Sequence, residues 1–229
     1  MIFAAVKGEN VIKCCVFDLD GTLLSTLDTI TLHLNNTLRR EGLLEITIDE
    51  CRTYIGDGAR KLVTRAVGKS GDVDGERFEK ILSTYNEAYN SDPLPLTEPY
   101  PGVIALVSEL VSRGYRLAVV TNKPEPTARK LVDHFFKDKF SLVIGGRSGA
   151  VLKPDPTDTL NAIAELGCLS SEAAFIGDTS VDILTAKNAD VALSVGVSWG
   201  FREITELLTA GADVIIDEAR NLICELENR

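Results

Sequence analysis

A series of short apolar runs constrains the fold more than any other feature of the sequence. These runs are rich in Val, Ile and Phe, show little alternation, and cover residues 11–17, 115–120, 140–144, 173–176, 191–197 and 213–216. Runs of this kind are typical of strands in a parallel sheet that is covered on both faces. From residue 100 onward they alternate with helical patterns. The sequence therefore predicts a doubly wound α/β fold with a mostly parallel sheet and right-handed crossovers.

Residues 26–92 break this alternation, because they show helical patterns only. Apolar stripes at helical spacing recur along them, and Thr47 with Glu50 forms a capping box that predicts a helix start. Four of the eight prolines then fall between residues 93 and 101 and predict a stiff connector. We therefore expect an α/β core domain of residues 1–22 and 98–229 and an all-helical domain of residues 23–97, inserted after the first strand.

Charge and composition exclude several classes of partner. The chain of 229 residues has a formal net charge of -10, which disfavours nucleic acid and anionic membrane surfaces. It contains no apolar stretch of transmembrane length and no pattern of a secretion signal at its start. The five cysteines lack paired spacing, which favours reduced thiols over a disulfide framework. We expect a cytoplasmic protein, either a monomer or a homodimer.

Polar residues follow several of the predicted strands. In open α/β sheets, ligands bind outside the carboxyl ends of the strands, so these residues are candidates for one site. In chain order they are Asp18, Asp20, Thr121, Asn122, Lys123, Lys153, Asp178 and Asp182.

Four carboxylates at one edge of a sheet repel one another in a partly dry site. Either some of them are protonated or a cation lies among them. The ligands would all be oxygen atoms, since neither His33 nor His134 lies near these strand ends, and such a set favours Mg²⁺ over Zn²⁺. Both histidines are interpreted as surface or packing residues. A cation with Lys153 and Thr121 would suit a phosphoryl group, which a carboxylate can attack while a second carboxyl group protonates the leaving oxygen.

Four segments, taken together, resemble the haloacid dehalogenase superfamily. They are D-x-D-G-T after the first strand, Thr-Asn after the second, Lys-Pro, and G-D-T-x-x-D, and they occur in that superfamily's order. The resemblance covers the chain except for about the first ten residues. The helical segment after the first strand is similar to that superfamily's small helical cap.

This resemblance implies roles for the four carboxylates. Asp18 would be the nucleophile and Asp20 the general acid and base. The side chains of Asp18 and Asp178, with the backbone carbonyl of Asp20, would hold Mg²⁺. Asp182 would bind the metal through water or anchor its ligands, although an Asp at a strand end is also often a turn or N-cap residue.

The resemblance also implies roles for the polar residues that follow the second and third strands. Thr121 and Asn122 would bind phosphoryl oxygens, and Lys153 would neutralise Asp18 and the phosphate. For Lys123 a functional role and a structural role are equally open. Trp199 is interpreted as a packing residue.

Two further segments are similar to the phosphoglycolate phosphatase group within that superfamily. They are residues 54–67 and residues 197–202. Gly56 and Gly58 lie just before a predicted helix N-terminus, where an anion could approach. Arg60 is our candidate for binding a substrate carboxylate, with Lys61 and Arg65 as alternatives, although a solvated helix face is the simpler interpretation of any one of them.

The resemblance leaves the substrate open. It favours a Mg²⁺-dependent phosphatase for a small phosphate monoester. Ser25 stands where many relatives carry an acidic residue, which weakens the alternative of a sugar phosphomutase. Pyrophosphate and nucleotide substrates stay open, and a non-enzymatic binding module is the least favoured alternative. No G-x-G-x-x-G follows the first strand, so a dinucleotide-binding protein is disfavoured.

Overall fold

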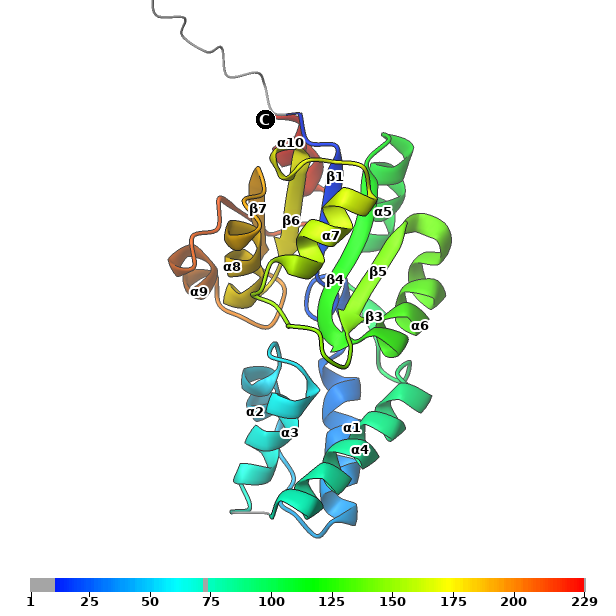
Figure 1. Ribbon diagram of the computed structural model, residues 1–229, viewed down its shortest axis with the longest axis vertical. Coiled ribbons are helices and arrows are strands. Elements are labelled where there is room, and N and C mark those ends of the chain that lie inside the picture. The colour runs from blue at the N-terminus through cyan, green and yellow to red at the C-terminus, as the bar shows by residue number, and fades with distance from the viewer. Residues whose placement is uncertain (1–10, 72–73, 229) are drawn as a thin grey trace, which may run out of the picture.

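The computed structural model describes residues 11–71 and 74–228, and its centre is a six-stranded parallel sheet (Figure 1). The strand order is β5-β4-β1-β6-β7-β8, so β1 lies in the middle. All six predicted strands are confirmed. Their bounds are Cys14–Phe17 for β1, Arg116–Pro124 for β4, Leu142–Gly146 for β5, Ala173–Gly177 for β6, Leu193–Val197 for β7 and Val214–Ile216 for β8.

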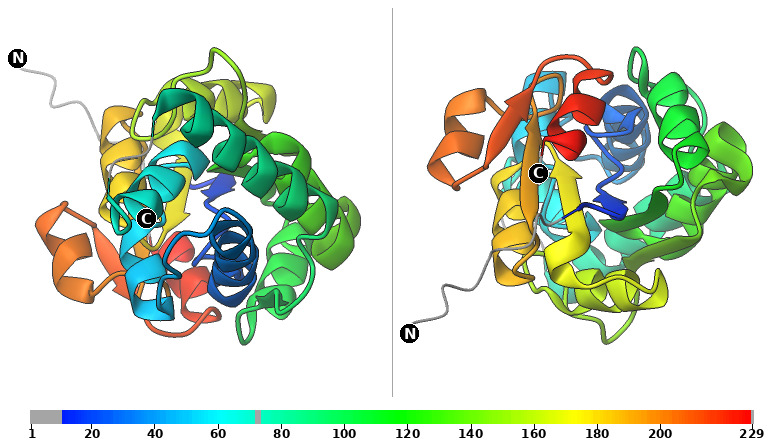
Figure 2. Two further views of the ribbon diagram at one scale, coloured as in Figure 1. Left: turned by 90° about the horizontal axis from the view of Figure 1, so that it is seen from below. Right: turned by 90° about the horizontal axis from the view of Figure 1, so that it is seen from above.

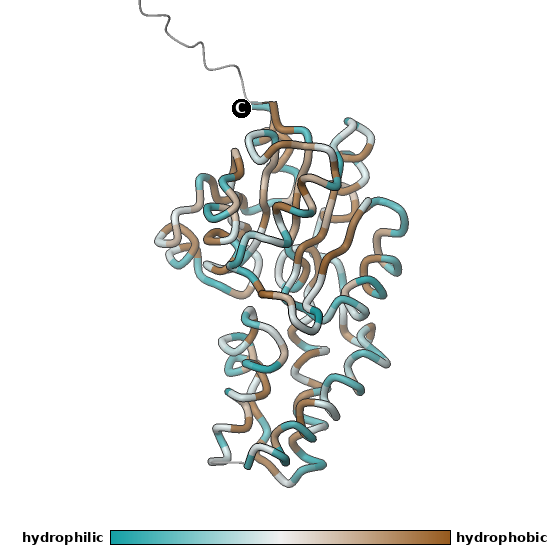
Figure 3. The backbone as a smooth tube through the Cα atoms, in the orientation of Figure 1, coloured by the Kyte–Doolittle hydropathy of each residue, from teal (hydrophilic) through white to brown (hydrophobic). Residues whose placement is uncertain are grey.

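Helices cover both faces of this sheet, as the doubly wound fold requires. Cys15 and Phe17 of β1 belong to the core cluster that also contains residues of α5, α6 and α10. Cys14 and Val16 point the other way, into a cluster with residues of α7 and α8. The helices are α5 Val103–Ser112, α6 Glu125–Phe136, α7 Thr157–Glu165, α8 Ser180–Asn188, α9 Ile204–Thr209 and α10 Asn221–Glu227. Burial on both sides explains why the strands are continuous apolar runs, which Figure 3 shows in brown.

Four helices of the described chain lie within residues 27–91, between β1 and α5, and we call them the helical insertion. They are α1 Leu27–Arg40, α2 Ile48–Tyr54, α3 Ala59–Gly68 and α4 Gly75–Ser91. They pack around an apolar cluster of their own, which one aromatic residue of the α/β part, Phe201, also enters. The capping box at α2 is confirmed, because the Glu50 N–H donates to Thr47 Oγ1 at 3.1 Å and the Thr47 N–H donates to Glu50 Oε2 at 2.7 Å. The insertion lies in front of the sheet in the view from below in Figure 2.

Two short strands connect the insertion to the sheet. β2 Leu24–Ser25 pairs antiparallel with β3 Glu98–Pro99. Pro99 of the predicted proline-rich connector lies in β3. A proline is tolerated in a two-residue edge strand, where few ladder hydrogen bonds are needed. The predicted boundaries of the two domains fall next to this ribbon and remain predictions.

Three further features concern the cysteines, one carboxylate between strands and the length of the helices. All five cysteines are free, and Cys14 and Cys15 are buried as expected. Asp213 connects β7 to β8 and α8, since its carboxylate accepts from the Ser194 N–H at 2.8 Å and from Lys187 Nζ at 2.7 Å. Across residues 11–71 and 74–228, every helix is too short or too polar to span a bilayer.

Candidate active site

The carboxyl ends of the central strands deliver polar side chains to one buried point. Asp18 directly follows β1, and its N–H donates to the Ile176 carbonyl at 2.9 Å, which prolongs the alignment with β6. Gly21 has a φ of +90°, and a Cβ at that position would lie 2.2 Å from Asp178 Oδ2. Only glycine therefore allows the chain to turn here while Asp178 stays against the turn.

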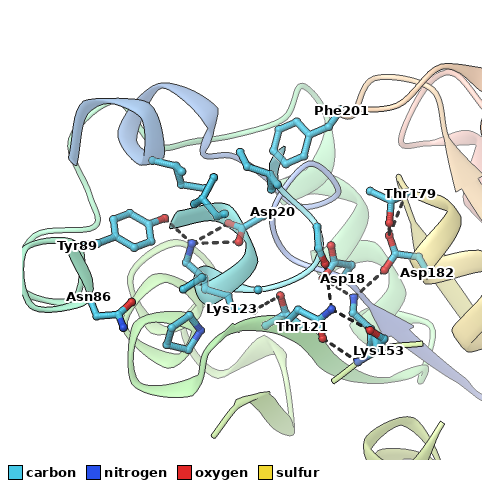
Figure 4. Close-up of a pocket in the computed structure, with 18 of the residues that line it drawn as sticks. Asp18, Asp20, Asn86, Tyr89, Thr121, Lys123, Lys153, Thr179, Asp182 and Phe201 are labelled. Atoms are coloured by element: carbon cyan, nitrogen blue, oxygen red, sulfur yellow. Dashed lines mark hydrogen bonds and ion pairs between the residues drawn. The ribbon is translucent and has the colours of Figure 1, made fainter. Parts of the chain in front are cut away.

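One lysine bridges two of the acids. Lys153 Nζ lies 2.7 Å from Asp18 Oδ1 and 2.6 Å from Asp182 Oδ1 (Figure 4). The carboxylates of Asp18, Asp178 and Asp182 each offer an oxygen, and these oxygens lie within 4.8 Å of one another. All four side chains are buried. The structure thus brings together, from three segments that are distant in the sequence, the groups that we expected at this edge of the sheet.

The electrostatics of this cluster favour a bound cation. Burial, reinforced by Asp182 and Asp20, raises the pKa of Asp18 to about 6 although Lys153 opposes the rise. Burial and the neighbouring carboxylates raise the pKa of Asp178 well above its usual range. Burial alone would lower the pKa of Lys153, but Asp18 and Asp182 outweigh it and raise that pKa. One ammonium leaves two negative charges uncompensated, so the all-oxygen set fits a hard divalent cation such as Mg²⁺.

Asp182 contacts both the start of its own helix and Lys153, while its predicted role at a metal remains a prediction. It lies in the first turn of α8, and its Oδ2 accepts from the Thr179 N–H at 3.0 Å and from Thr179 Oγ1 at 2.7 Å. Its other oxygen accepts from Lys153 and belongs to the acidic cluster. The residue therefore caps the helix and also fixes the position of the lysine.

Asp178 is held by two groups whose contacts the sequence analysis did not predict. Thr22 Oγ1 donates to Asp178 Oδ1 at 3.0 Å, and the Phe201 N–H donates to Asp178 Oδ2 at 2.8 Å. Asp178 is fully buried. Hydrogen bonds to both of its oxygens fix the orientation of the carboxylate.

Asp20 faces away from this cluster, toward the helical insertion. Its Oδ1 and Oδ2 lie 2.9 and 3.1 Å from Lys123 Nζ, which also donates to the hydroxyl of Tyr89 on α4 (Figure 4). Burial lowers the pKa of Lys123, and Asp20 partly offsets this effect. The lysine whose role was left open thus joins the predicted acid–base group to the insertion. Coordination of a metal by the backbone carbonyl of Asp20 remains a prediction.

The two predicted phosphate ligands are placed differently. Thr121 is buried at the pocket wall, and its Oγ1 accepts from the Lys123 N–H at 3.3 Å. The side chain of Asn122 instead connects three segments, because Nδ2 donates to the carbonyls of Gly56 at 3.0 Å and Lys153 at 3.2 Å, and Oδ1 accepts from the Lys153 N–H at 2.8 Å. Its side-chain amide is thus committed to the backbone, and the binding of phosphoryl oxygens by Asn122 remains a prediction.

These residues line a pocket between the sheet and the insertion. Its enclosed volume is only about 60 Å³, within a space of about 620 Å³ that includes open solvent. The insertion contributes a mainly apolar and aromatic wall. Its lining residues there are Ile30, Ile55, Gly56, Gly58, Ala59, Leu62, Tyr85, Asn86 and Tyr89. Among the described residues, the cationic side chains that line the pocket are Lys123 and Lys153, and both come from the α/β part.

The structure does not bring Arg60 to this pocket, contrary to our candidate assignment. Its guanidinium pairs with Glu79 on α4, with an NH1–Oε1 distance of 2.6 Å, and its side chain is 60% exposed. Lys61 and Arg65 both pair with Asp57 instead. The solvated-face interpretation of this helix agrees with these contacts, because α3 turns Leu62 and not its cations toward the pocket.

The remaining interpretations concern residues away from the chemistry. The His33 ring lies beside Tyr89 and its Nε2 contacts the Asp92 carbonyl at 2.8 Å, while His134 is exposed on α6. Trp199 packs against the main core, and its Nε1 donates to the Thr22 carbonyl at 3.1 Å. All three agree with surface or packing roles. Sequence reasoning missed Phe201. The signal that could have found it is its position four residues beyond Val197, where β7 ends.

Comparison with known proteins gives consistent results. The family model for haloacid dehalogenase-like hydrolases matches residues 15–195. A phosphoglycolate phosphatase of Rhodospirillum rubrum is 35% identical over 216 residues, which cover 92% of this chain and 89% of that protein. One of Aquifex aeolicus is 30% identical, with 94% and 97% covered. The crystal structure of a predicted phosphoglycolate phosphatase from Haemophilus somnus has a TM-score of 0.87 at 28% identity and covers 93% of this chain and 97% of its own.

Proposed function

The chain belongs to the haloacid dehalogenase-like hydrolase family and is a phosphatase, and we propose that it hydrolyses a small phosphate monoester of the phosphoglycolate class. In this proposal the reaction depends on Mg²⁺ and passes through a phosphoaspartyl intermediate. One observation carries the proposal. Lys153 bridges Asp18 and Asp182 beside the buried Asp178, at the floor of a pocket that the helical insertion covers. In this proposal the helical insertion acts as a cap.

Asp18 is the proposed nucleophile. One of its carboxylate oxygens forms a bond to phosphorus as the bond between phosphorus and the ester oxygen breaks. Lys153 holds Asp18 in place and offsets negative charge as the phosphoryl group approaches. Asp18, Asp178 and the Asp20 carbonyl would hold Mg²⁺, with Asp182 supporting them, and Mg²⁺ when bound would neutralise charge on the phosphoryl oxygens.

Asp20 is the proposed general acid and base. In its protonated form it gives a proton to the departing ester oxygen, so that the product leaves as an alcohol. As a carboxylate it then takes a proton from the water that attacks phosphorus, which releases inorganic phosphate and restores Asp18. Lys123 keeps the Asp20 side chain on the side of the pocket where the leaving group must lie.

The size and lining of the pocket support a small substrate. A wall of Leu62, Tyr85 and Tyr89 limits the leaving group, and Asn86 adds a neutral polar contact. Since the cations of α3 face solvent, Lys123 is the cation placed nearest to read a substrate carboxylate. This assignment replaces the role we gave to Arg60.

A screen of purified protein tests the proposal. Phosphate release is measured with and without Mg²⁺ for 2-phosphoglycolate, nucleotides, sugar phosphates and pyrophosphate. We expect Mg²⁺-dependent release that is fastest for 2-phosphoglycolate, and a phosphorylated Asp18 peptide after acid quench and mass spectrometry. Asp18→Asn should abolish both signals. Full activity of Asp18→Asn would refute the mechanism, and a preference for nucleotides or pyrophosphate would refute the substrate class.

A further inference from the structure

Residues 199–202, which follow β7, run between the acidic cluster and the helical insertion, and we call them the clasp. At its start, Trp199 donates to the carbonyl of Thr22, whose hydroxyl donates to Asp178. In its middle, the Phe201 N–H donates to the other oxygen of Asp178. The clasp therefore holds a proposed metal ligand directly through Phe201 and indirectly through Thr22.

The backbone of the clasp is pressed against Asp178. A Cβ built on Gly200 would lie 2.2 Å from the Cβ and 2.5 Å from Oδ2 of Asp178. Such distances leave no room for a side chain at this position. A shift of the clasp therefore has to move Asp178 or break its hydrogen bond to Phe201.

The far end of the clasp is embedded in the insertion. The Phe201 side chain is only 7% exposed, belongs to the apolar cluster of α1–α4, and lines the substrate pocket. Phe201 thus joins the two parts, with its backbone on Asp178 and its ring among the insertion's side chains.

Arg202 completes the connection at the C-terminus of α2. Its guanidinium donates to the carbonyls of Arg52, Thr53 and Ile55, at 3.3 Å for Thr53 and 2.7 Å for Ile55. The last carbonyls of a helix lack intrahelical partners and carry partial negative charge, so a partly buried cation suits them. The Arg202 side chain is only 18% exposed, which makes these contacts stronger than those of a solvated arginine.

We propose that the clasp holds the helical insertion closed over the pocket, and that Arg202 is a positioning residue that makes the phosphatase selective for small esters. This inference rests on the proposed function. With Arg202 in place, the insertion encloses the pocket, and a small leaving group is held close to Asp20. Without it, α2 loses three hydrogen-bond donors from the α/β part, and the insertion moves away from the sheet. A small substrate then loses its enclosure, whereas a bulky activated ester gains access.

Arg202→Met tests the proposal, because methionine keeps apolar length and removes the cation and all donors. The measurement is kcat/KM for 2-phosphoglycolate and for p-nitrophenyl phosphate. We expect the ratio of the first to the second to fall at least tenfold, through a higher KM for 2-phosphoglycolate, and Arg202→Lys to restore part of it. Arg113→Met is the matched control, since Arg113 pairs with Glu109 and Glu227 away from the insertion, and its ratio should be unchanged.

A loss of activity in equal proportion for both esters would overturn the proposal, because it would mean only that less protein is folded. Hydrogen exchange provides a second readout that needs no substrate. The amides of residues 48–62 should exchange at least tenfold faster in Arg202→Met than in Arg113→Met, and equal exchange would also overturn the proposal. If the unmodified protein hydrolyses no ester, the proposed function fails, while the exchange experiment still decides whether Arg202 holds the insertion.

Discussion

Replacing the proposed nucleophile should make the metal-free protein more stable. In the folded protein the pKa of Asp18 is raised from 3.8 to about 6, chiefly by burial. An acid with a raised pKa contributes stability below its unfolded pKa and loses that contribution as the pH rises through the folded pKa. A shift of roughly two units corresponds to about 3 kcal/mol of lost unfolding free energy above pH ~7.

Asparagine has nearly the same shape and carries no charge, so Asp18→Asn removes this destabilisation. It also weakens one hydrogen bond from Lys153, which keeps its second partner, Asp182, at 2.6 Å. Exchange of a charged for a neutral acceptor loses about 1 kcal/mol. The expected net stabilisation is therefore about 1–2 kcal/mol at pH ~8, and it should be largely lost near pH ~4, where Asp18 is neutral in the folded protein and about half protonated in the unfolded chain.

The assay is urea unfolding of Asp18→Asn and the unmodified protein in EDTA at both pH values. Asp133→Asn, at an exposed position on α6, is the control and should change the free energy of unfolding little. Added Mg²⁺ should then favour the unmodified protein, by about 2.7 kcal/mol at a concentration 100 times Kd. A variant that is less stable than the unmodified protein in EDTA at the higher pH would refute the electrostatic reasoning.

Three other substitutions test separate features. Gly200→Ala should raise the Mg²⁺ concentration for half-maximal turnover at least tenfold, because the new Cβ collides with Asp178; an unchanged Mg²⁺ titration would contradict this. Lys123 holds the proposed general acid, Asp20, in place. Lys123→Met should therefore lower kcat by about 10²–10⁴, the usual contribution of a general acid, and an unaltered kcat would exclude this role of Lys123. Burial alone would raise the pKa of Asp213, but hydrogen bonds from its partners hold it below its usual range. The stabilisation that the Asp213 carboxylate provides is thus present above pH ~4 and lost at lower pH. The free energy of unfolding of Asp213→Asn should therefore be about 1–2 kcal/mol lower than that of the unmodified protein at pH ~7, and this difference should shrink on acidification.

The sheet could be predicted because its signal is local. Each strand is covered on both faces, so its own residues carry the apolar run that identifies it. The end of β4 was missed because Thr121 to Pro124 are polar or proline, and their extended conformation depends on pairing with β5 through Gly146. The ribbon of β2 and β3 has two residues a strand, which is too short for any periodic pattern.

The candidate site likewise contains residues whose position could be predicted from the sequence and residues whose position could not. Asp18 and Asp178 follow strands directly, so the position of the strand determines that of the side chain. Lys153 lies seven residues beyond β5 and was identified from its motif instead. Arg60 was misassigned because the sequence shows that α3 has a polar face but not which way that face turns. The rotation depends on Leu62 packing inward, which leaves Arg60 beside Glu79 of α4.

The contacts that the sequence could not reveal are those that connect chemistry to substrate choice. Lys123 joins Asp20 to Tyr89, and Phe201 of the clasp joins Asp178 to the apolar cluster of the insertion. In each pair the partners lie more than 20 positions apart in the sequence, so no local pattern records them. Both connections begin at a proposed catalytic or metal-holding carboxylate and end in α1–α4. A change of substrate-reading residues in the insertion would therefore preserve turnover only if Tyr89 and the packing around Phe201 are kept, since these hold Asp20 and Asp178 where the reaction needs them.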